Sequence, residues 1–263
     1  MAIEALKTAR RDGGALRYLD EGSGEPALLF VHGWCCDHTY WRPQISEFSR
    51  RHRVVAVDLR GHGASDKPDE EYTISGYVDD LAWLFGSIGL QRPVAIGHSM
   101  GGVIVANLVR KHPALARAAV FVDSLLMPLG PDFQPLRQQV SEGLRSPQYQ
   151  QVASQFIGQY LFREESPSSL RDEVIAGMTV TPQRVMYSSI ENMFEDENLQ
   201  AGALPVPALF VRAATLPVTE EQLREAQPGM EVRTLDCAHF VQLEKAEEFN
   251  AILSEILEEG LVG

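Results

Sequence analysis

Cysteine is scarce in this chain of 263 residues, and the few that are present do not form a disulfide pattern. The three cysteines are Cys35, Cys36 and Cys237, an odd number with two adjacent members. Disulfide-rich secreted domains use even sets of spaced cysteines, so this set argues against that class. The first residues, Met1 to Glu4, also lack the basic and apolar stretches of a secretory signal. We therefore expect reduced thiols and a cytoplasmic location.

Positive charge is in short supply as well. The chain has 23 Lys and Arg against 36 Asp and Glu, which gives a net charge of −13. Nucleic acids and anionic membranes attract cationic surfaces, so we expect neither as a partner. No apolar run approaches the ~20 residues of a membrane span. A small-molecule substrate is the expected partner, and whether the chain forms a homo-oligomer stays open.

Metal-ligand motifs are missing from the sequence. The histidines are scattered, and the cysteines lack the spacing of a metal site. No glycine-rich loop of the kind that holds phosphate stands out either. We therefore expect no metal and no other cofactor.

Short apolar runs of strand length alternate with segments of helical periodicity. The runs lack polar alternation, which is typical of strands covered on both faces. They cover Leu28–Val31, Val54–Val57, Val94–Ile96, Ala118–Val122, Ala208–Val211 and Val232–Leu235. Ile3 to Ala9 and Leu16 to Leu19 predict a hairpin around Asp12-Gly13-Gly14, as an antiparallel edge. Helices are predicted over Thr73–Gly89 and Glu247–Glu259. This alternation indicates an α/β fold with a mostly parallel sheet.

One stretch, residues 126–201, interrupts the alternation. It contains no convincing strand, only helical segments separated by prolines. These segments are Gln134–Arg145, Gln148–Phe162, Ser168–Met178 and Gln183–Asn198. A simple crossover does not need so much helix, so we expect an inserted helical cap over the carboxyl edge of the sheet. The alternative is a set of ordinary surface helices.

The pentapeptide Gly97-His98-Ser99-Met100-Gly101 lies between a predicted strand and a predicted helix. A serine on such a sharp turn presents its hydroxyl to open space, and the glycines allow strand and helix to approach closely. The helix N-terminus behind it offers free amide donors. The context predicts a nucleophile at Ser99.

A serine nucleophile needs a base, and the base needs an orienting acid. His239 follows the last predicted strand and is the best candidate base. Asp123 ends the strand expected beside that of the serine, so we predict it as the acid. Asp236 is the alternative acid, and Asp58 more simply supports a loop.

An oxyanion needs two amide donors. The N–H of Met100 directly follows the nucleophile, and the N–H of Trp34 follows the bend at Gly33. We predict these two groups as the oxyanion hole, and we expect the Trp34 ring to form a wall of the pocket.

Four segments together resemble the α/β-hydrolase superfamily over nearly the whole chain. They are His32-Gly33, Asp58 to Pro68, Gly97 to Gly101 and Cys237 to Phe240. The resemblance implies a mostly parallel eight-stranded sheet flanked by helices, with a core of residues 1–125 and 202–263 and a cap of residues 126–201. In many members the acid follows the strand that is Ala208–Val211 here, but no carboxylate stands there. The chain is similar instead to members whose acid follows the strand after the nucleophile, which favours Asp123.

The segment His32 to Trp41 resembles bacterial esterase-like hydrolases and, more loosely, cofactor-free dioxygenases of this fold that open N-heteroaromatic rings. Those dioxygenases carry histidines where this chain has Cys36 and Met100, which argues against oxygenase chemistry. Haloalkane dehalogenases share the acid placement but use an aspartate nucleophile, which Ser99 excludes.

The resulting prediction is a serine hydrolase that cleaves a small carboxylic ester or lactone through an acyl-serine intermediate. Ser99, His239 and Asp123 are the predicted catalytic residues. The predicted pocket residues are His38, His98, Met127 and Phe240, and Phe133, Phe156, Tyr160 and Met193 are further apolar candidates from the cap. Two alternatives remain: a cofactor-independent dioxygenase acting on an N-heteroaromatic substrate, and a non-catalytic binding protein for a small molecule.

Overall fold

The computed structural model describes residues 6–11 and 13–259, which form an eight-stranded sheet of order β1-β2-β4-β3-β5-β6-β7-β8. The strands are β1 (Lys7–Arg11), β2 (Gly14–Glu21), β3 (Leu28–Val31), β4 (Val54–Asp58), β5 (Val94–His98), β6 (Ala118–Val122), β7 (Ala208–Ala213) and β8 (Glu231–Leu235). β2 runs antiparallel to β1 and β4, and every other pair is parallel. The predicted mostly parallel sheet and its hairpin edge are confirmed. Residues 3–5 and Asp12 of the hairpin prediction lie outside the described residues.

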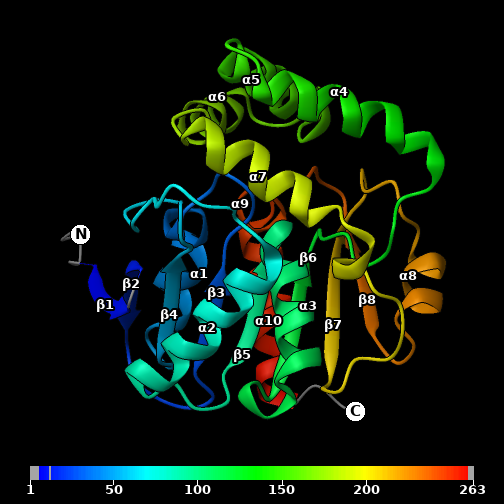
Figure 1. Cartoon of the computed structure of the whole chain (residues 1–263). Helices are drawn as coiled ribbons and strands as arrows, with labels where there is room; N and C mark the ends of the chain where they lie inside the picture. Colours follow the sequence, from blue (N-terminus) through cyan, green and yellow to red (C-terminus); the bar gives the residue numbers. More distant parts are fainter. Residues whose placement is uncertain (1–5, 12, 260–263) are drawn as a thin grey trace.

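Helices cover both faces of the sheet (Figure 1). α2 (Ile74–Ile88) and α3 (Met100–Lys111) lie on one face, and α1 (Arg42–Phe48) and α10 (Ala246–Glu259) lie on the other. Within β3, Leu29 packs into the hydrophobic core on the side of α2 and α3, and Phe30 packs into the core on the side of α1 and α10. Both side chains are fully buried, which explains why the strand sequences show no polar alternation.

α2 forms where the sequence predicts it. The Thr73 hydroxyl accepts a hydrogen bond of 3.0 Å from the Gly76 N–H and caps the first turn. Gly89 ends the helix in the left-handed conformation, with φ 61°. The apolar positions between these residues form one buried face against the sheet.

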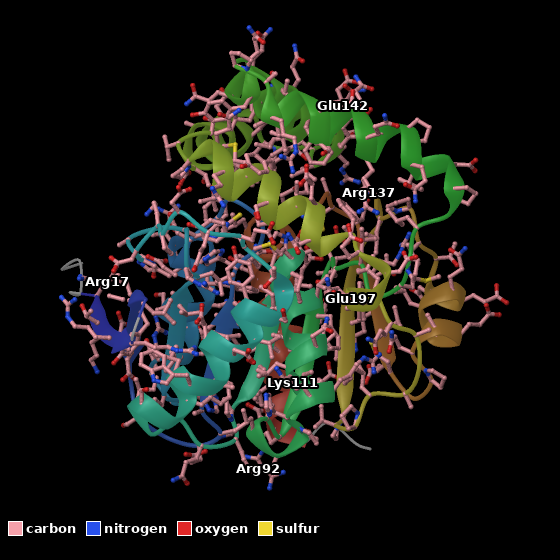
Figure 2. The ribbon with its side chains drawn as sticks, viewed as in Figure 1. Arg17, Arg92, Lys111, Arg137, Glu142 and Glu197 are labelled. Atoms are coloured by element: carbon pink, nitrogen blue, oxygen red, sulfur yellow. The ribbon has the colours of Figure 1, made fainter. Side chains whose placement is uncertain are left out.

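Four helices form a layer beyond the end of the sheet toward which β5 and β6 point (Figure 1). They are α4 (Gln134–Arg145), α5 (Tyr149–Tyr160), α6 (Ser168–Met178) and α7 (Gln183–Met193). All residues of 126–201 are described, and none of them lies in a strand. α4 and α6 have the predicted bounds, and the exposed Glu142 of α4 points away from the sheet (Figure 2). α7 ends earlier than predicted because the Phe194 N–H bonds to the Glu191 carbonyl and closes the helix, and residues 196–198 form a separate turn.

The remaining elements are short. They are α8 (Glu220–Ala226), α9 (Val241–Glu244) and the 3₁₀ helices η1 (His38–Trp41), η2 (Pro113–Leu115), η3 (Pro131–Phe133) and η4 (Asp196–Asn198). Within residues 6–11 and 13–259, no helix combines the length and apolar character that a membrane crossing requires.

Candidate active site

Ser99 occupies the sharp turn between β5 and α3, with φ 52° and ψ −119°. This conformation is strained for a residue with a side chain and costs about 1–3 kcal/mol. The flanking glycines make the turn feasible. A Cβ on Gly97 would lie 2.3 Å from the Gly101 carbonyl oxygen, and one on Gly101 would lie 2.2 Å from the Val31 carbonyl oxygen. Close packing of strand and helix therefore excludes any side chain at either glycine.

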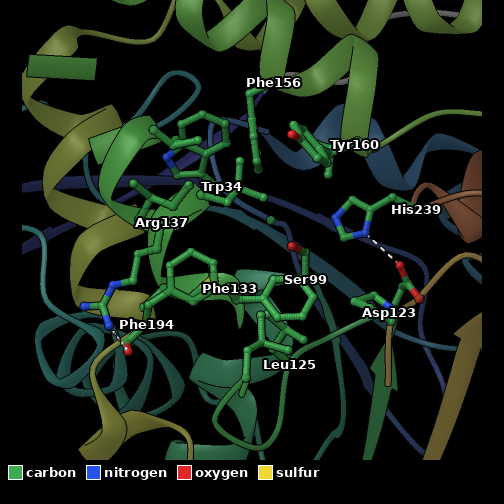
Figure 3. Close-up of a pocket in the computed structure, with 18 of the residues that line it drawn as sticks. Trp34, Ser99, Asp123, Leu125, Phe133, Arg137, Phe156, Tyr160, Phe194 and His239 are labelled. Carbon is green, nitrogen blue, oxygen red and sulfur yellow. Dashed lines mark hydrogen bonds and ion pairs between the residues drawn. The ribbon is translucent and has the colours of Figure 1, made fainter. Parts of the chain in front are cut away.

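Asp123 and His239 meet although 116 positions separate them in the sequence. His239 Nδ1 lies 2.7 Å from Asp123 Oδ2, and this hydrogen bond orients the imidazole (Figure 3). The other carboxylate oxygen, Oδ1, accepts a hydrogen bond of 2.8 Å from the Ala213 N–H at the end of β7. Asp123 itself has a positive φ of 46° just after β6 and is buried. The carboxylate is thus held between a strand end and the loop that carries the histidine.

Ser99 and His239 both line one cavity and face the same space (Figure 3). Among the described residues, the Ser99 hydroxyl has no hydrogen-bond partner. Contacts between a nucleophile and its base are often long in unliganded enzymes and shorten when substrate binds. The arrangement therefore presents a hydroxyl, an oriented imidazole and a carboxylate in the chain order Ser, Asp, His.

The alternative acids lie elsewhere. The exposed side chain of Asp236 forms an ion pair with Arg163, and the Asp236 carbonyl accepts a second bond from the same guanidinium. Asp58 accepts hydrogen bonds of 2.8 Å from the N–H groups of His38 and Ala64, so it supports two loops. Neither carboxylate contacts His239.

The turn after β3 packs directly against the serine. A Cβ on Gly33 would lie 3.1 Å from Ser99 Cβ. The backbone N–H groups of Trp34 and Met100 have no hydrogen-bond partner within residues 6–11 and 13–259. Buried N–H groups are nearly always paired in proteins, so two free ones beside a serine are available for a ligand oxygen.

His98 connects the serine turn to the histidine loop. It is buried, and its Nε2 donates a hydrogen bond of 3.0 Å to the His239 carbonyl oxygen. Its other nitrogen, Nδ1, is buried without a partner, and the two imidazole rings lie 4.6 Å apart between centroids. Burial, reinforced by the neighbouring His239, lowers the pKa of His98 well below its usual value. His98 is therefore a neutral imidazole with the proton on Nε2.

The cavity has a volume of about 350 Å³ and lies between the sheet edge and the helical layer. His98 and Phe240 line it, as do Trp34 and the cap residues Phe133, Phe156, Tyr160 and Met193. The loop after β7, Thr215 to Pro217, lines it as well, although sequence reasoning did not include that loop. The sequence did contain a clue to this loop, because it follows a predicted strand and therefore lies at the carboxyl edge of the sheet.

Two predicted pocket residues are corrected, because His38 and Met127 do not line the cavity. His38 is held outside the cavity by Asp58, because its Nδ1 lies 2.7 Å from Asp58 Oδ1. Burial acts to lower the pKa of His38, but the bond and charge of Asp58 outweigh it and raise the pKa. Met127 is half-buried and packs against the hydrophobic core instead.

One group of potential metal ligands occurs among the described residues, formed by Asp37, His38 and Asp58. Its carboxylates are already used by the protein. Asp37 accepts from the Thr39 N–H at 2.8 Å, and Asp58 binds His38 and Ala64. These bonds account for the cluster as a structural brace.

Comparisons with known proteins agree with the fold described above. A family model described as alpha/beta hydrolase fold matches residues 26–246. The chain is 36% identical over 108 residues to the 2-(acetamidomethylene)succinate hydrolase of Mesorhizobium japonicum, covering 41% of this chain and 38% of that enzyme. It is 34% identical over 129 residues to the bifunctional epoxide hydrolase 2 of Sus scrofa, covering 48% and 23%. The matched stretches thus span well under half the length of these curated relatives.

A solved structure is similar over nearly the full length. The chain resembles a thermophilic esterase from Thermogutta terrifontis, solved with malate bound, with a TM-score of 0.79 and 26% identity over 97% of each chain. The family match spans most of the sequence, and the sheet order and the serine turn agree with it. The chain therefore belongs to the α/β-hydrolase family.

Proposed function

We propose that this protein is a serine hydrolase that cleaves a carboxylic ester or lactone through an acyl-serine intermediate. The observation that carries the proposal is the 2.7 Å bond between His239 Nδ1 and Asp123, in a cavity that Ser99 also lines. Serine is a weak nucleophile until a base accepts its proton, and this histidine is oriented to do so. The likeness to a solved esterase supports ester cleavage as the reaction.

In this mechanism Ser99 Oγ attacks the carbonyl carbon of the substrate while His239 Nε2 accepts the hydroxyl proton. Asp123 stabilises the resulting imidazolium. The N–H groups of Trp34 and Met100 bind the oxyanion of the tetrahedral intermediate, and each such donor is worth about 10²–10³ in rate. His239 then protonates the leaving alcohol, and water activated by the same base releases the acid.

We also propose that residues 126–201, which include the helical layer, form a cap on a core of residues 1–125 and 202–263. Supporting this division, the cavity is lined from both parts: Phe133 and Phe156 come from the layer, and Ser99 and His239 come from the sheet edge. A cap in this position excludes water and selects substrates by shape.

The test is the hydrolysis of p-nitrophenyl butyrate by the wild type and by Ser99→Ala. We expect turnover in the wild type, loss in the variant, and a fluorophosphonate adduct on Ser99 detected by mass spectrometry. Styrene oxide is the competing substrate, because one relative is an epoxide hydrolase. Absence of ester turnover and of the adduct would overturn the proposal and favour a binding protein. Oxygen uptake with a hydroxyquinolone-type substrate, retained in Ser99→Ala, would favour the dioxygenase alternative.

A further inference from the structure

Resting on the proposed ester hydrolysis, we infer that the cavity selects uncharged, apolar esters and rejects esters that carry a carboxylate. The inference concerns the part of the substrate away from the reacting carbonyl. It follows from which side chains form the walls and from what the charged ones already bind.

The walls are mainly aromatic and aliphatic. Trp34 and Phe156 meet edge to face with ring centroids 6.0 Å apart, and Phe133 and Phe194 lie on the other side of the space in front of Ser99 (Figure 3). Aliphatic side chains of α4 and α7, such as Val140 and Ile190, continue this lining. Such a surface stabilises hydrocarbon by removing it from water.

Arg137 is the one Lys or Arg among the described residues that line the cavity, and its charge is already engaged. Its Nη1 donates to the Phe194 carbonyl oxygen at 3.0 Å, and its Nη2 donates to Glu195 at 2.7 Å. The guanidinium also lies 5.8 Å from the centre of the Phe194 ring. Figure 3 shows it directed toward the Phe194 carbonyl rather than toward Ser99. A substrate carboxylate would therefore compete with Glu195 and the Phe194 carbonyl for this guanidinium.

The other charged groups of the lining are acidic. Glu191 accepts a hydrogen bond of 2.8 Å from Arg145 Nε and another from the Ser141 hydroxyl. Asp123 is bonded to His239 and Ala213. Asp196 is exposed beside them. A carboxylate on the substrate would therefore be repelled by these acidic groups as well as disfavoured by the apolar wall.

The size of the cavity makes this cost hard to avoid. A volume of about 350 Å³ lies at the small end of ligand pockets, which run from ~300 to ~1,000 Å³. A compact ester that fills it must give up most of the water around its far end. Burying a carboxylate without a cation is strongly unfavourable, whereas a methyl ester in its place is stabilised by the same walls.

The experiment compares two substrates with one skeleton: p-nitrophenyl methyl adipate, which is neutral, and p-nitrophenyl hydrogen adipate, which ends in a carboxylate. We expect kcat/KM for the neutral ester to be at least about 30-fold higher, with KM carrying most of the difference. Equal or better use of the charged ester would overturn the inference and leave ester hydrolysis standing. Turnover of neither adipate ester would also overturn the inference, and only the additional absence of p-nitrophenyl butyrate hydrolysis would overturn the proposed function itself.

A surface variant tests the role of the Arg137 ion pair without touching the cavity. Glu195→Gln removes the competing charge but leaves the bond to the Phe194 carbonyl, so kcat/KM for the charged ester should rise about three- to tenfold while the neutral ester is unaffected. Glu255→Gln is the matched control, because Glu255 pairs with Arg233 on the sheet edge at β8. No rise in Glu195→Gln, or an equal rise in Glu255→Gln, would contradict the claim that Glu195 withholds this cation.

Discussion

Asp123 is the residue whose single role matters most to the proposed chemistry. Replacing it with asparagine keeps the shape but removes the charge that stabilises the imidazolium and fixes its tautomer. We expect Asp123→Asn to lower kcat by about 10⁴ while the fold persists. Steady-state kinetics on p-nitrophenyl butyrate and a thermal melt measure the two effects. Asp236→Asn is the control and should retain activity, and a fully active Asp123→Asn would move the acid elsewhere.

We expect His98 to act as a positioning residue for the base, because its Nε2 donates a hydrogen bond to the His239 carbonyl oxygen. In His98→Phe the ring remains but the N–H is lost, so the loop carrying the base is no longer fixed. Because displacement of about 1 Å costs up to ~10² in rate, we expect kcat to fall about 10–100-fold with KM within about threefold.

The conservative variant His98→Gln separates positioning from packing. Glutamine Nε2 can occupy the position of imidazole Nε2 and donate the same bond, so it should recover most of the lost kcat. A loss of kcat equal to that of His98→Phe, or a change confined to KM and stability, would contradict the positioning role.

At the scale of single elements, the bond between His38 and Asp58 joins η1 to the end of β4. The pKa of His38 is raised above its usual 6.5, so its stabilisation is complete below about pH 6.5 and is lost as pH rises through the folded value. Burial acts to raise the pKa of Asp58, but its bond to His38 holds it below 3.8, so that contribution fails only in strong acid.

We therefore expect His38→Gln to lower Tm most near pH 5.5 and least near pH 9, by about 2–4 °C at the lower pH if the pair contributes about 1 kcal/mol. Thermal melts across this range provide the measurement. His112→Gln, at the end of α3, is the control. A deficit that grows toward high pH would contradict the assignment.

How much the sequence could predict differs between elements and contacts. The strands, α2, and the joint placement of Ser99, Asp123 and His239 follow from local patterns, because parallel strands end at the same sheet edge. The position of His38 does not, since it depends on a bond to Asp58 20 residues away. The pairing of Arg137 with Glu195 depends likewise on how α4 docks near α7. The positions of both side chains depend on contacts between distant elements, and the periodicity of a single segment does not predict such contacts.

At the scale of the whole molecule, α7 ties the helical layer to loops that flank β3 and α2. Trp34 Nε1 donates to the Met186 carbonyl at 2.8 Å, and the Tyr72 N–H donates to Ser188 Oγ at 2.8 Å. α7 buries six residues, whereas α4 buries two, Val140 and Leu144. The layer thus has an anchored side and a less buried side.

This asymmetry predicts unequal hydrogen exchange, because segments with few buried apolar contacts open at lower free energy. Amides of α4 should exchange at least about tenfold faster than those of α7, as measured by mass spectrometry on the intact chain. α3, buried on the sheet, is the internal reference for slow exchange. Equal protection of α4 and α7 would show that the layer moves, or stays closed, as one unit.

In the proposed mechanism the acid lies at the end of β6, so the loop after β7 takes no part in proton transfer. That loop, Thr215 to Pro217, still borders the cavity. Its length and sequence could therefore change, by evolution or by design, to accept new leaving groups without altering Ser99, Asp123 or His239. Substitutions that change the substrate range should therefore accumulate in this loop first.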